Sequence, residues 1–214
     1  MLNKISIENY KSIEKVEIDI KDINILIGSN GAGKSNFISF FKLLNSIIKQ
    51  RLQSHIAEES GANNVFHHGL KNSEFIKGEF DFKNRGHYNT YSFTLRANND
   101  GGVFFDEEIP SYYHSSYGQE YLYNIANGNA ETNLIKYNKT YSEYVKERLQ
   151  EFRLYHFHDT GKTALVKQSF NIQDNEFLYE DARNLASFLF RLSIKEPKIL
   201  EKIAEFAFNE RTSQ

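Results

Sequence analysis

Hydrophobic and polar positions alternate in two short stretches at the beginning of the chain. The first covers residues 2–8 and the second follows the turn at residues 9–12. Their apolar members are Ile5, Ile7, Val16, Ile18 and Ile20. Strict alternation of this kind predicts two half-buried strands. Because a short turn and no helix separates them, we expect the sheet to begin with an antiparallel pair.

The next stretch, Ile23–Ile27, is almost continuously apolar, which predicts a buried strand. A glycine-rich turn follows it. Beyond the turn, apolar residues recur at helical spacing and predict an amphipathic helix that turns this stripe toward the core. The residues of the stripe are Phe37, Phe40, Phe41, Leu44, Ile47 and Ile48.

The middle of the chain changes from loop to strand. Residues 55–70 have no clear period, and we interpret them as a loop. Strands are predicted at residues 75–82, 90–95 and 103–109. The last two flank a run of Asn, Asp and Gly at residues 98–102, which is a strong hairpin signal.

The last hundred residues are more varied. Residues 111–140 are rich in Tyr, Asn, Ser and Gly, so we expect long loops or an insertion there. Residues 141–152 predict a charged helix, and residues 153–158 predict a strand. Two helices are expected at the end of the chain, one over about 182–192 and one that begins at Pro197, since proline suits a first helical turn.

Composition narrows the class of protein. With 214 residues, 40% of them hydrophobic, the chain can form one domain or a domain with an appendage. The net charge of −2 gives no general basic field for nucleic acid. The absence of cysteine excludes disulfides and thiolate metal sites and is compatible with the cytosol. We find neither a secretory signal nor an apolar run of membrane-spanning length, so a cytoplasmic protein without membrane contact is expected.

The turn between Ile27 and the helix carries the clearest chemistry. Its sequence, Gly28-Ser29-Asn30-Gly31-Ala32-Gly33-Lys34-Ser35, has the G-x-x-x-x-G-K-S pattern between an apolar run and a helical pattern. Glycines let the backbone approach a phosphate closely, and the N–H groups of the loop and the helix N-terminus then face the anion. Lys34 would reach the β- and γ-phosphates, and the Ser35 hydroxyl would bind Mg²⁺. We therefore expect ATP and Mg²⁺ as ligands rather than a turn that is glycine-rich by chance.

Two of these segments resemble a known class of ATPases. The opening I-S-I-E-N-Y-K-S-I of residues 5–13 is similar to the first strand of ABC-type ATPase heads of the RecF/SMC class. The loop G-S-N-G-A-G-K-S-N of residues 28–36 resembles the G-x-N-G-[AS]-G-K-S-N of the same class. Residues 155–160, 174–175 and 184–192 resemble bacterial ATPases often called AAA15/21-like, which include proteins of DNA repair and anti-phage defence.

The resemblance implies a fold and a domain organisation. The expected fold is α/β with α+β character, in which a P-loop lobe one carries an antiparallel β-subdomain and leads to a C-terminal helical segment. Lobe one would cover residues 1–160, with a loop-rich insertion at about 111–140, and residues 161–214 would begin a helical region leading to lobe two. Because such heads pair around two nucleotides, a homodimer or head-to-head oligomer is implied. DNA or an effector nuclease or toxin subunit would be the partner.

The resemblance also assigns site residues. Those expected to contact the phosphates or Mg²⁺ are Asn30, Gly31, Ala32, Gly33, Lys34, Ser35 and Asn36. Lys11 and Ser12 would lie near the base and ribose or near the phosphates. His158 and Asp159 fall roughly where the Q-loop of the family leaves lobe one, which makes them candidates for a place near the nucleotide.

The sequence departs from the family in the motifs of hydrolysis. We find no L-S-x-G signature, and the nearest match to Walker B is the run 103–108, V-F-F-D-E-E. Its three apolar residues follow a tight turn, which favours a hairpin strand with a charged end. Catalytic residues are therefore unassigned, and the chain is expected to be the N-terminal half of a head. Two functions follow as alternatives: an ATPase head that needs lobe two, or a nucleotide-binding scaffold without turnover.

Several other residues have more than one interpretation. His156 and His158 would share a strand face and could bind a metal, sense the γ-phosphate or make ordinary hydrogen bonds. His67 and His68 are interpreted as solvated loop residues. A tyrosine-rich stretch could stack bases, but it lacks interleaved Arg or Lys, so packing or a protein interface is favoured. Its members are Tyr112, Tyr113, Tyr117, Tyr121 and Tyr123.

Overall fold

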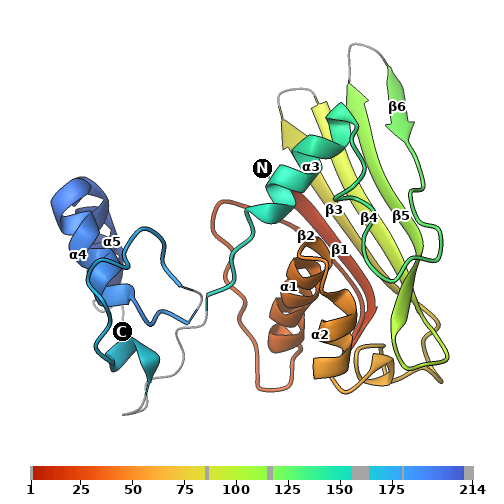
Figure 1. Cartoon of the computed structure of the whole chain (residues 1–214), viewed down its shortest axis with the longest axis horizontal. Coiled ribbons are helices and arrows are strands. Elements are labelled where there is room, and N and C mark those ends of the chain that lie inside the picture. Colours follow the sequence, from red (N-terminus) through yellow and green to blue (C-terminus); the bar gives the residue numbers. More distant parts are fainter. Residues whose placement is uncertain (1, 85–86, 115–117, 156–163, 180, 210–214) are drawn as a thin grey trace. The chain divides into compact units, whose positions relative to one another are not determined.

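The computed structural model describes residues 2–84, 87–114, 118–155, 164–179 and 181–209. The chain divides into two compact units, Met1–Phe152 and Arg153–Gln214. The first unit contains a sheet with three α-helices, and the second contains two further α-helices (Figure 1).

The sheet of the first unit has six strands in the order β2-β1-β3-β4-β5-β6, and every neighbouring pair is antiparallel. Their bounds are β1 Leu2–Tyr10, β2 Ile13–Asp19, β3 Ile76–Asn84, β4 His87–Ala97, β5 Val103–His114 and β6 Gln119–Leu122. The predicted antiparallel start is confirmed, because β1 and β2 pair across the turn at Lys11 and Ser12. The predicted hairpin at residues 98–102 joins β4 and β5.

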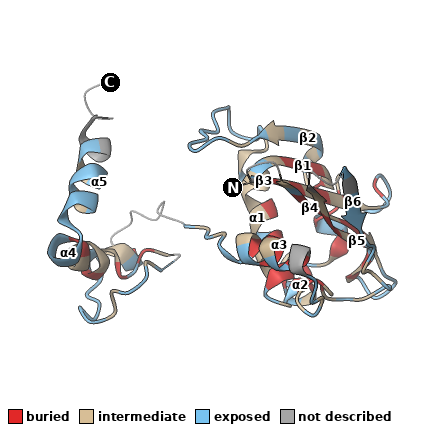
Figure 2. Cartoon of the chain, turned by 90° about the horizontal axis from the view of Figure 1, so that it is seen from above, coloured by how far each residue is buried: buried red, intermediate tan, exposed pale blue. Residues whose placement is uncertain are grey.

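Three helices cover one face of this sheet: α1 Lys34–Ile48, α2 Leu52–Glu58 and α3 Thr140–Gln150 (Figure 1). Buried residues lie between the helices and the sheet (Figure 2). At the centre of this core, the ring of Phe40 stacks on the rings of Phe80 and Phe93, with 6.1 Å between the centroids in both pairs. Such pairs add to the stabilisation that burial of their apolar area provides.

The buried stripe of α1 is rotated from the predicted one. The fully or nearly fully buried residues are Phe40, Leu43, Leu44, Ile47 and Ile48. Phe37 and Phe41 are only half-buried. Phe37 lines an open cleft beside β2, and the ring of Phe41 packs edge-on against the rings of Phe37 and Phe152. This cleft is part of the candidate site described below.

The prediction of a buried strand at Ile23–Ile27 is wrong. In the structure this segment is irregular, and the side chains of Ile23, Ile25 and Ile27 are 72%, 74% and 90% exposed. A buried strand needs a neighbour that pairs with its backbone and covers its side chains. No strand among the described residues pairs with this segment.

Two regions predicted as loops contain regular structure. Residues 55–70 include the end of α2 and a 3-10 turn, Ala62–Asn64. The prediction missed α2 because its buried positions, Leu52, His55 and Ile56, cover fewer than two helical turns. Residues 111–140 include the end of β5 and all of β6 before the chain becomes irregular.

The second unit contains α4, Leu185–Lys195, and α5, Pro197–Asn209, as the helical patterns predicted, and a 3-10 turn at Leu165–Lys167. Asn184, which is fully buried, organises the loop before α4. Its side-chain oxygen accepts a hydrogen bond from the Tyr179 amide at 2.9 Å, and its side-chain nitrogen donates to the Phe177 carbonyl at 2.7 Å. Residues 153–155 are irregular, and the rest of the strand predicted at 153–158 lies outside the described residues.

Candidate functional site

A glycine-rich loop leads into the N-terminus of α1. Gly31 and Gly33 have φ angles of +86° and +90°, which residues with a Cβ rarely adopt. Gly33 is also the N-cap residue of α1, and it contributes no side-chain hydrogen bond to the first turn. The first turn carries no acidic residue. Its amides and the partial positive charge of the helix end therefore suit an anion such as a phosphate.

Lys34, the first residue of α1, folds back over this loop. Its ammonium donates hydrogen bonds to the carbonyl oxygens of Gly28 at 2.6 Å and Ser29 at 2.8 Å. The cation is thus held above the loop by partners that are neutral. Because a charged acceptor forms a stronger bond than a neutral carbonyl, a phosphate entering the loop would be favoured as a partner of Lys34.

The turn between β1 and β2 lies against the beginning of α1. The Asn36 side-chain nitrogen donates to the Ser12 hydroxyl at 2.6 Å, and the hydroxyls of Tyr10 and Ser39 are 3.0 Å apart in a second hydrogen bond. Burial raises the pKa of Tyr10, so its phenol stays neutral and keeps this bond at physiological pH. The structure therefore brings Ser12 next to the first turn of α1.

Lys11 is held by a different segment, the chain that follows α2. Its ammonium lies 2.8 Å from a carboxylate oxygen of Glu59. Its amide donates to the Val65 carbonyl at 2.9 Å, and its carbonyl lies 2.8 Å from Nδ1 of His67. These contacts fix a backbone with φ of +50°, which costs free energy for a residue other than glycine.

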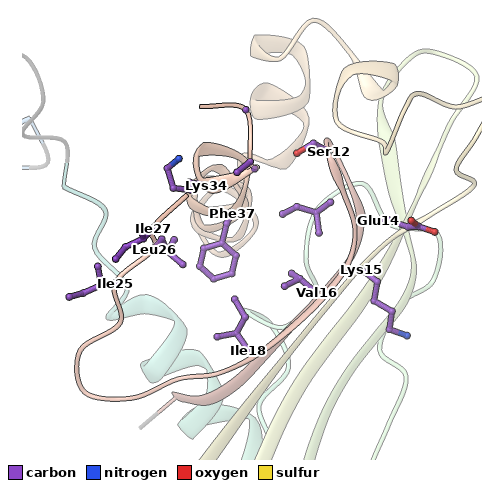
Figure 3. A pocket seen from close by; sticks show the side chains of 14 residues that line it. Ser12, Glu14, Lys15, Val16, Ile18, Ile25, Leu26, Ile27, Lys34 and Phe37 are labelled. Carbon is purple, nitrogen blue, oxygen red and sulfur yellow. The ribbon is translucent and has the colours of Figure 1, made fainter. Parts of the chain in front are cut away.

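A cleft of about 570 Å³ lies between β2 and the segment before the loop (Figure 3). Val16 and Ile18 of β2 form one wall, and Ile25 lies on the opposite side. The ring of Phe37 lies between the two walls (Figure 3). Gly31, Ala32, Gly33 and Lys34 also line the cleft, so a partly apolar space adjoins the glycine-rich loop.

The run that resembles Walker B belongs to the β4–β5 hairpin. The Asp106 carboxylate accepts a hydrogen bond from Nε of Arg96 at 2.7 Å, and the Glu107 carboxylate accepts one from the Thr94 hydroxyl at 3.1 Å. Both partners are on β4, and β5 pairs with β4 and β6 rather than with the segment at Ile23–Ile27. The interpretation as a hairpin strand agrees with this arrangement.

The other candidate residues have separate places. Tyr112 lies 2.7 Å from Nδ1 of His87, whereas Tyr121 and Tyr123 are 39% and 57% exposed. His156, His158, Asp159 and Tyr117 lie outside the described residues. Glu59 and His67 both contact Lys11. The sequence did not predict these contacts, because they join positions 48 and 56 residues apart. His67, which was predicted to be a solvated loop residue, is therefore half-buried and contacts the turn between β1 and β2.

The chain matches the family model described as AAA ATPase domain (AAA_15) over residues 1–210. The chain belongs to this family. No curated protein matches it. Membership of the AAA ATPase domain family agrees with the P-loop and its resemblance to AAA15-like heads, and it identifies the chain as a P-loop ATPase domain.

The described residues offer a fit for a nucleotide phosphate but not for a separate metal centre. Among them, no group of three or more histidine and acidic side chains could hold a metal ion. A Mg²⁺ ion bound with the nucleotide needs a protein hydroxyl rather than such a cluster. Ser35 follows Lys34 at the exposed start of α1 and can supply it. Within the ranges that the structure describes, no helix combines the length and apolarity needed to cross a bilayer.

Proposed function

We propose that this domain binds Mg–ATP at the loop of residues 28–35. The amides of Asn30, Gly31, Ala32 and Gly33 and of the first turn of α1 would surround the phosphates, and Lys34 would turn from its carbonyl partners to the β- and γ-phosphates. The Ser35 hydroxyl would be a ligand of Mg²⁺. Asn36 and Ser12, joined by a hydrogen bond, would border the same site.

The observation that carries this proposal is the structure of the loop itself. Two glycines with positive φ precede a helix N-terminus without a side-chain cap, and the lysine of the motif lies over the loop. An oriented set of amides and one cation need little rearrangement to accept a phosphate. The family match supports the same ligand.

We further propose that the domain acts as lobe one of an ABC-type head in the cytoplasm. Residues 1–160 would form lobe one and residues 161–214 would begin the helical region that leads to lobe two. The exposed side chains of Ile23–Ile27 and the adjoining cleft support this proposal, because both would be covered by another strand. Paired heads would couple ATP hydrolysis to a change in DNA or in an effector subunit during DNA repair or anti-phage defence.

A second candidate is a scaffold that binds nucleotide without turnover. The observation that favours it is the engagement of Asp106 and Glu107 within the β4–β5 hairpin. These residues are the nearest match to a Walker B pair, and their partners Arg96 and Thr94 hold them on that hairpin. In this function the nucleotide would stabilise a conformation that a partner protein recognises.

Thermal unfolding with and without Mg–ATP tests nucleotide binding. A ligand that binds only the folded state stabilises it by about 2.7 kcal/mol at a concentration 100 times its Kd. We expect Mg–ATP to raise the melting temperature of the wild type. Lys34→Ala should abolish the shift, because the variant loses the charged partner of the phosphates.

Lys42→Ala is the matched control, since Lys42 is an exposed lysine two turns further along α1. This variant should keep the wild-type shift. An equal shift in Lys34→Ala and in the wild type would contradict the assignment of the P-loop as the binding site.

A further inference from the structure

Lys11 is the cation nearest in sequence to Ser12, yet its charge is already matched. The 2.8 Å contact with Glu59 is formed between side chains that are 17% and 30% exposed. An ion pair screened from water in this way is stronger than one on the open surface. Lys11 therefore presents little net positive charge to a ligand while Glu59 holds it.

The position of Lys11 gives this pair a consequence for the loop. Lys11 and Ser12 are the two residues of the turn between β1 and β2, and consecutive Cα atoms are about 3.8 Å apart. Ser12 contacts Asn36, in the first turn of α1. A lysine side chain is long and flexible, which a movement of the Lys11 ammonium from Glu59 toward a phosphate at the loop would require.

Among the residues that the structure describes, Lys11 is the cation that pairs with Glu59. His55 precedes Glu59 by about one helical turn and is 7% exposed. Burial lowers the pKa of His55, so its imidazole is neutral at pH 7 and does not compete for the carboxylate. The Lys11 ammonium also lies 5.6 Å from the centre of the Tyr10 ring. This cation–π contact stabilises the ammonium without supplying a negative charge.

We infer that Glu59 is a positioning residue that competes with nucleotide phosphates for Lys11 and so sets the domain's preference between nucleotides of different phosphate number. The inference rests on the proposed binding of nucleotide at the P-loop. Each additional phosphate attracts the released ammonium more strongly. The domain would thus hold Lys11 on Glu59 when a ligand has little charge and release it for a triphosphate.

Titration calorimetry with ATP, ADP and adenosine, each with Mg²⁺, tests this competition in the 214-residue chain and its variants. Glu59→Gln keeps the shape of the side chain but removes its charge. We expect this variant to bind ATP about 3- to 10-fold more tightly than the wild type, as a released unit charge a few ångströms from a phosphate would allow. The gain should be smaller for ADP and absent for adenosine.

Two further variants separate competition from a structural role. Glu59→Asp shortens the side chain and should give a smaller gain in the same order of ligands. The double variant Lys11→Ala, Glu59→Gln should lose the gain, because no ammonium remains to be released. Glu58→Gln is the matched control, as Glu58 is an exposed neighbour with the same charge, and it should leave the three affinities unchanged.

The outcomes distinguish this inference from the proposed function. If the wild type binds ATP in a Lys34-dependent manner but Glu59→Gln changes all three affinities equally or not at all, the competition is disproved and nucleotide binding stands. A gain that survives in the double variant also disproves it. If the wild type binds no ATP, both the proposed function and the competition are wrong.

Discussion

At the scale of single residues, the most constrained group is a carboxylate inside the sheet. Glu108 on β5 is completely buried. It accepts hydrogen bonds from the Tyr91 hydroxyl at 2.8 Å, from the Thr132 hydroxyl and from the Asn133 amide at 2.9 Å. Burial raises the pKa of Glu108, and these donors oppose the rise by stabilising the ionised form.

Tyr91→Phe should destabilise the domain by about 1.5–3 kcal/mol at neutral pH, which is the usual contribution of a hydrogen bond to a charged group. A carboxyl whose pKa is raised on folding contributes most stability below its unfolded pKa and loses it as the pH rises through the folded value. Because Tyr91 donates to the ionised carboxylate, its removal should raise the pKa of Glu108 further. The loss in Tyr91→Phe should therefore shrink as the falling pH protonates Glu108. Urea unfolding at pH 5 and pH 7.5 measures both effects.

Tyr88→Phe is the control for this prediction, because Tyr88 lies on the same strand and is 41% exposed. Its free energy of unfolding should stay within about 0.5 kcal/mol of the wild type. A loss in Tyr91→Phe that is the same at both pH values would contradict the role of the ionised carboxylate.

The sequence predicts the β5 strand but not the burial of Glu108. Alternation from Val103 and Phe105 would place Glu107 inward and Glu108 outward. The register between β4 and β5 shifts at Thr94 and Leu95, so that Asp106 is an extra residue on β5. A bulge of this kind reverses the faces of the residues that follow, which turns Glu108 into the core.

At the scale of elements, α2 depends on a residue from a distant loop. The Glu131 carboxylate accepts hydrogen bonds from the amides of Leu52 at 2.9 Å and Gln53 at 3.1 Å. The same loop is tied to the chain between α1 and α2 by the Gln50 side chain, which donates to the Thr132 carbonyl at 2.7 Å. The irregular part of residues 111–140 is therefore joined both to α2 and to the connection before it.

Glu131→Ala should destabilise the domain by about 1–2 kcal/mol, because the N-terminus of α2 loses its acceptor and its negative charge. Glu131→Gln keeps one oxygen and should lose less. Chemical denaturation gives the comparison, with Glu147→Ala on the exposed side of α3 as the control. Equal stability of Glu131→Ala and the control would show that the cap contributes nothing.

Helices long enough to show a repeated apolar pattern were predictable from the sequence. Elements that depend on contacts with a distant segment of the chain were not. The patterns of α1, α3, α4 and α5 extend over 11 residues or more and identify these helices. The seven residues of α2 are too few to show a period, and its cap lies 79 residues away. Ile23–Ile27 has the composition of a buried strand, but composition cannot supply a neighbouring strand.

At the scale of the whole molecule, the glycine-rich loop and the helix after it were easier to predict than the contacts around them. The motif at residues 28–35 requires particular residues at fixed spacing, so it identifies a loop and the helix after it from sequence alone. The contacts of Lys11 and Ser12 arise only when the β1–β2 turn meets α1 and the chain after α2. They depend on folding of the entire first unit.

Hydrolysis by this polypeptide is the last prediction. Phosphoryl transfer needs an acidic anchor for the metal and a group that orients the attacking water, in addition to a loop that holds the phosphates. The acidic run at Asp106 and Glu107 is engaged with Arg96 and Thr94 on the hairpin. Because losing a single stabilising donor costs about 10²–10³ in rate, we expect the 214-residue chain to bind ATP with turnover near the uncatalysed level.

An assay of phosphate release by the 214-residue chain and by Lys34→Ala measures this turnover. Rapid turnover that Lys34→Ala abolishes would prove the prediction wrong, and Glu14, which lines the cleft together with Lys34, would then be the first carboxylate to replace.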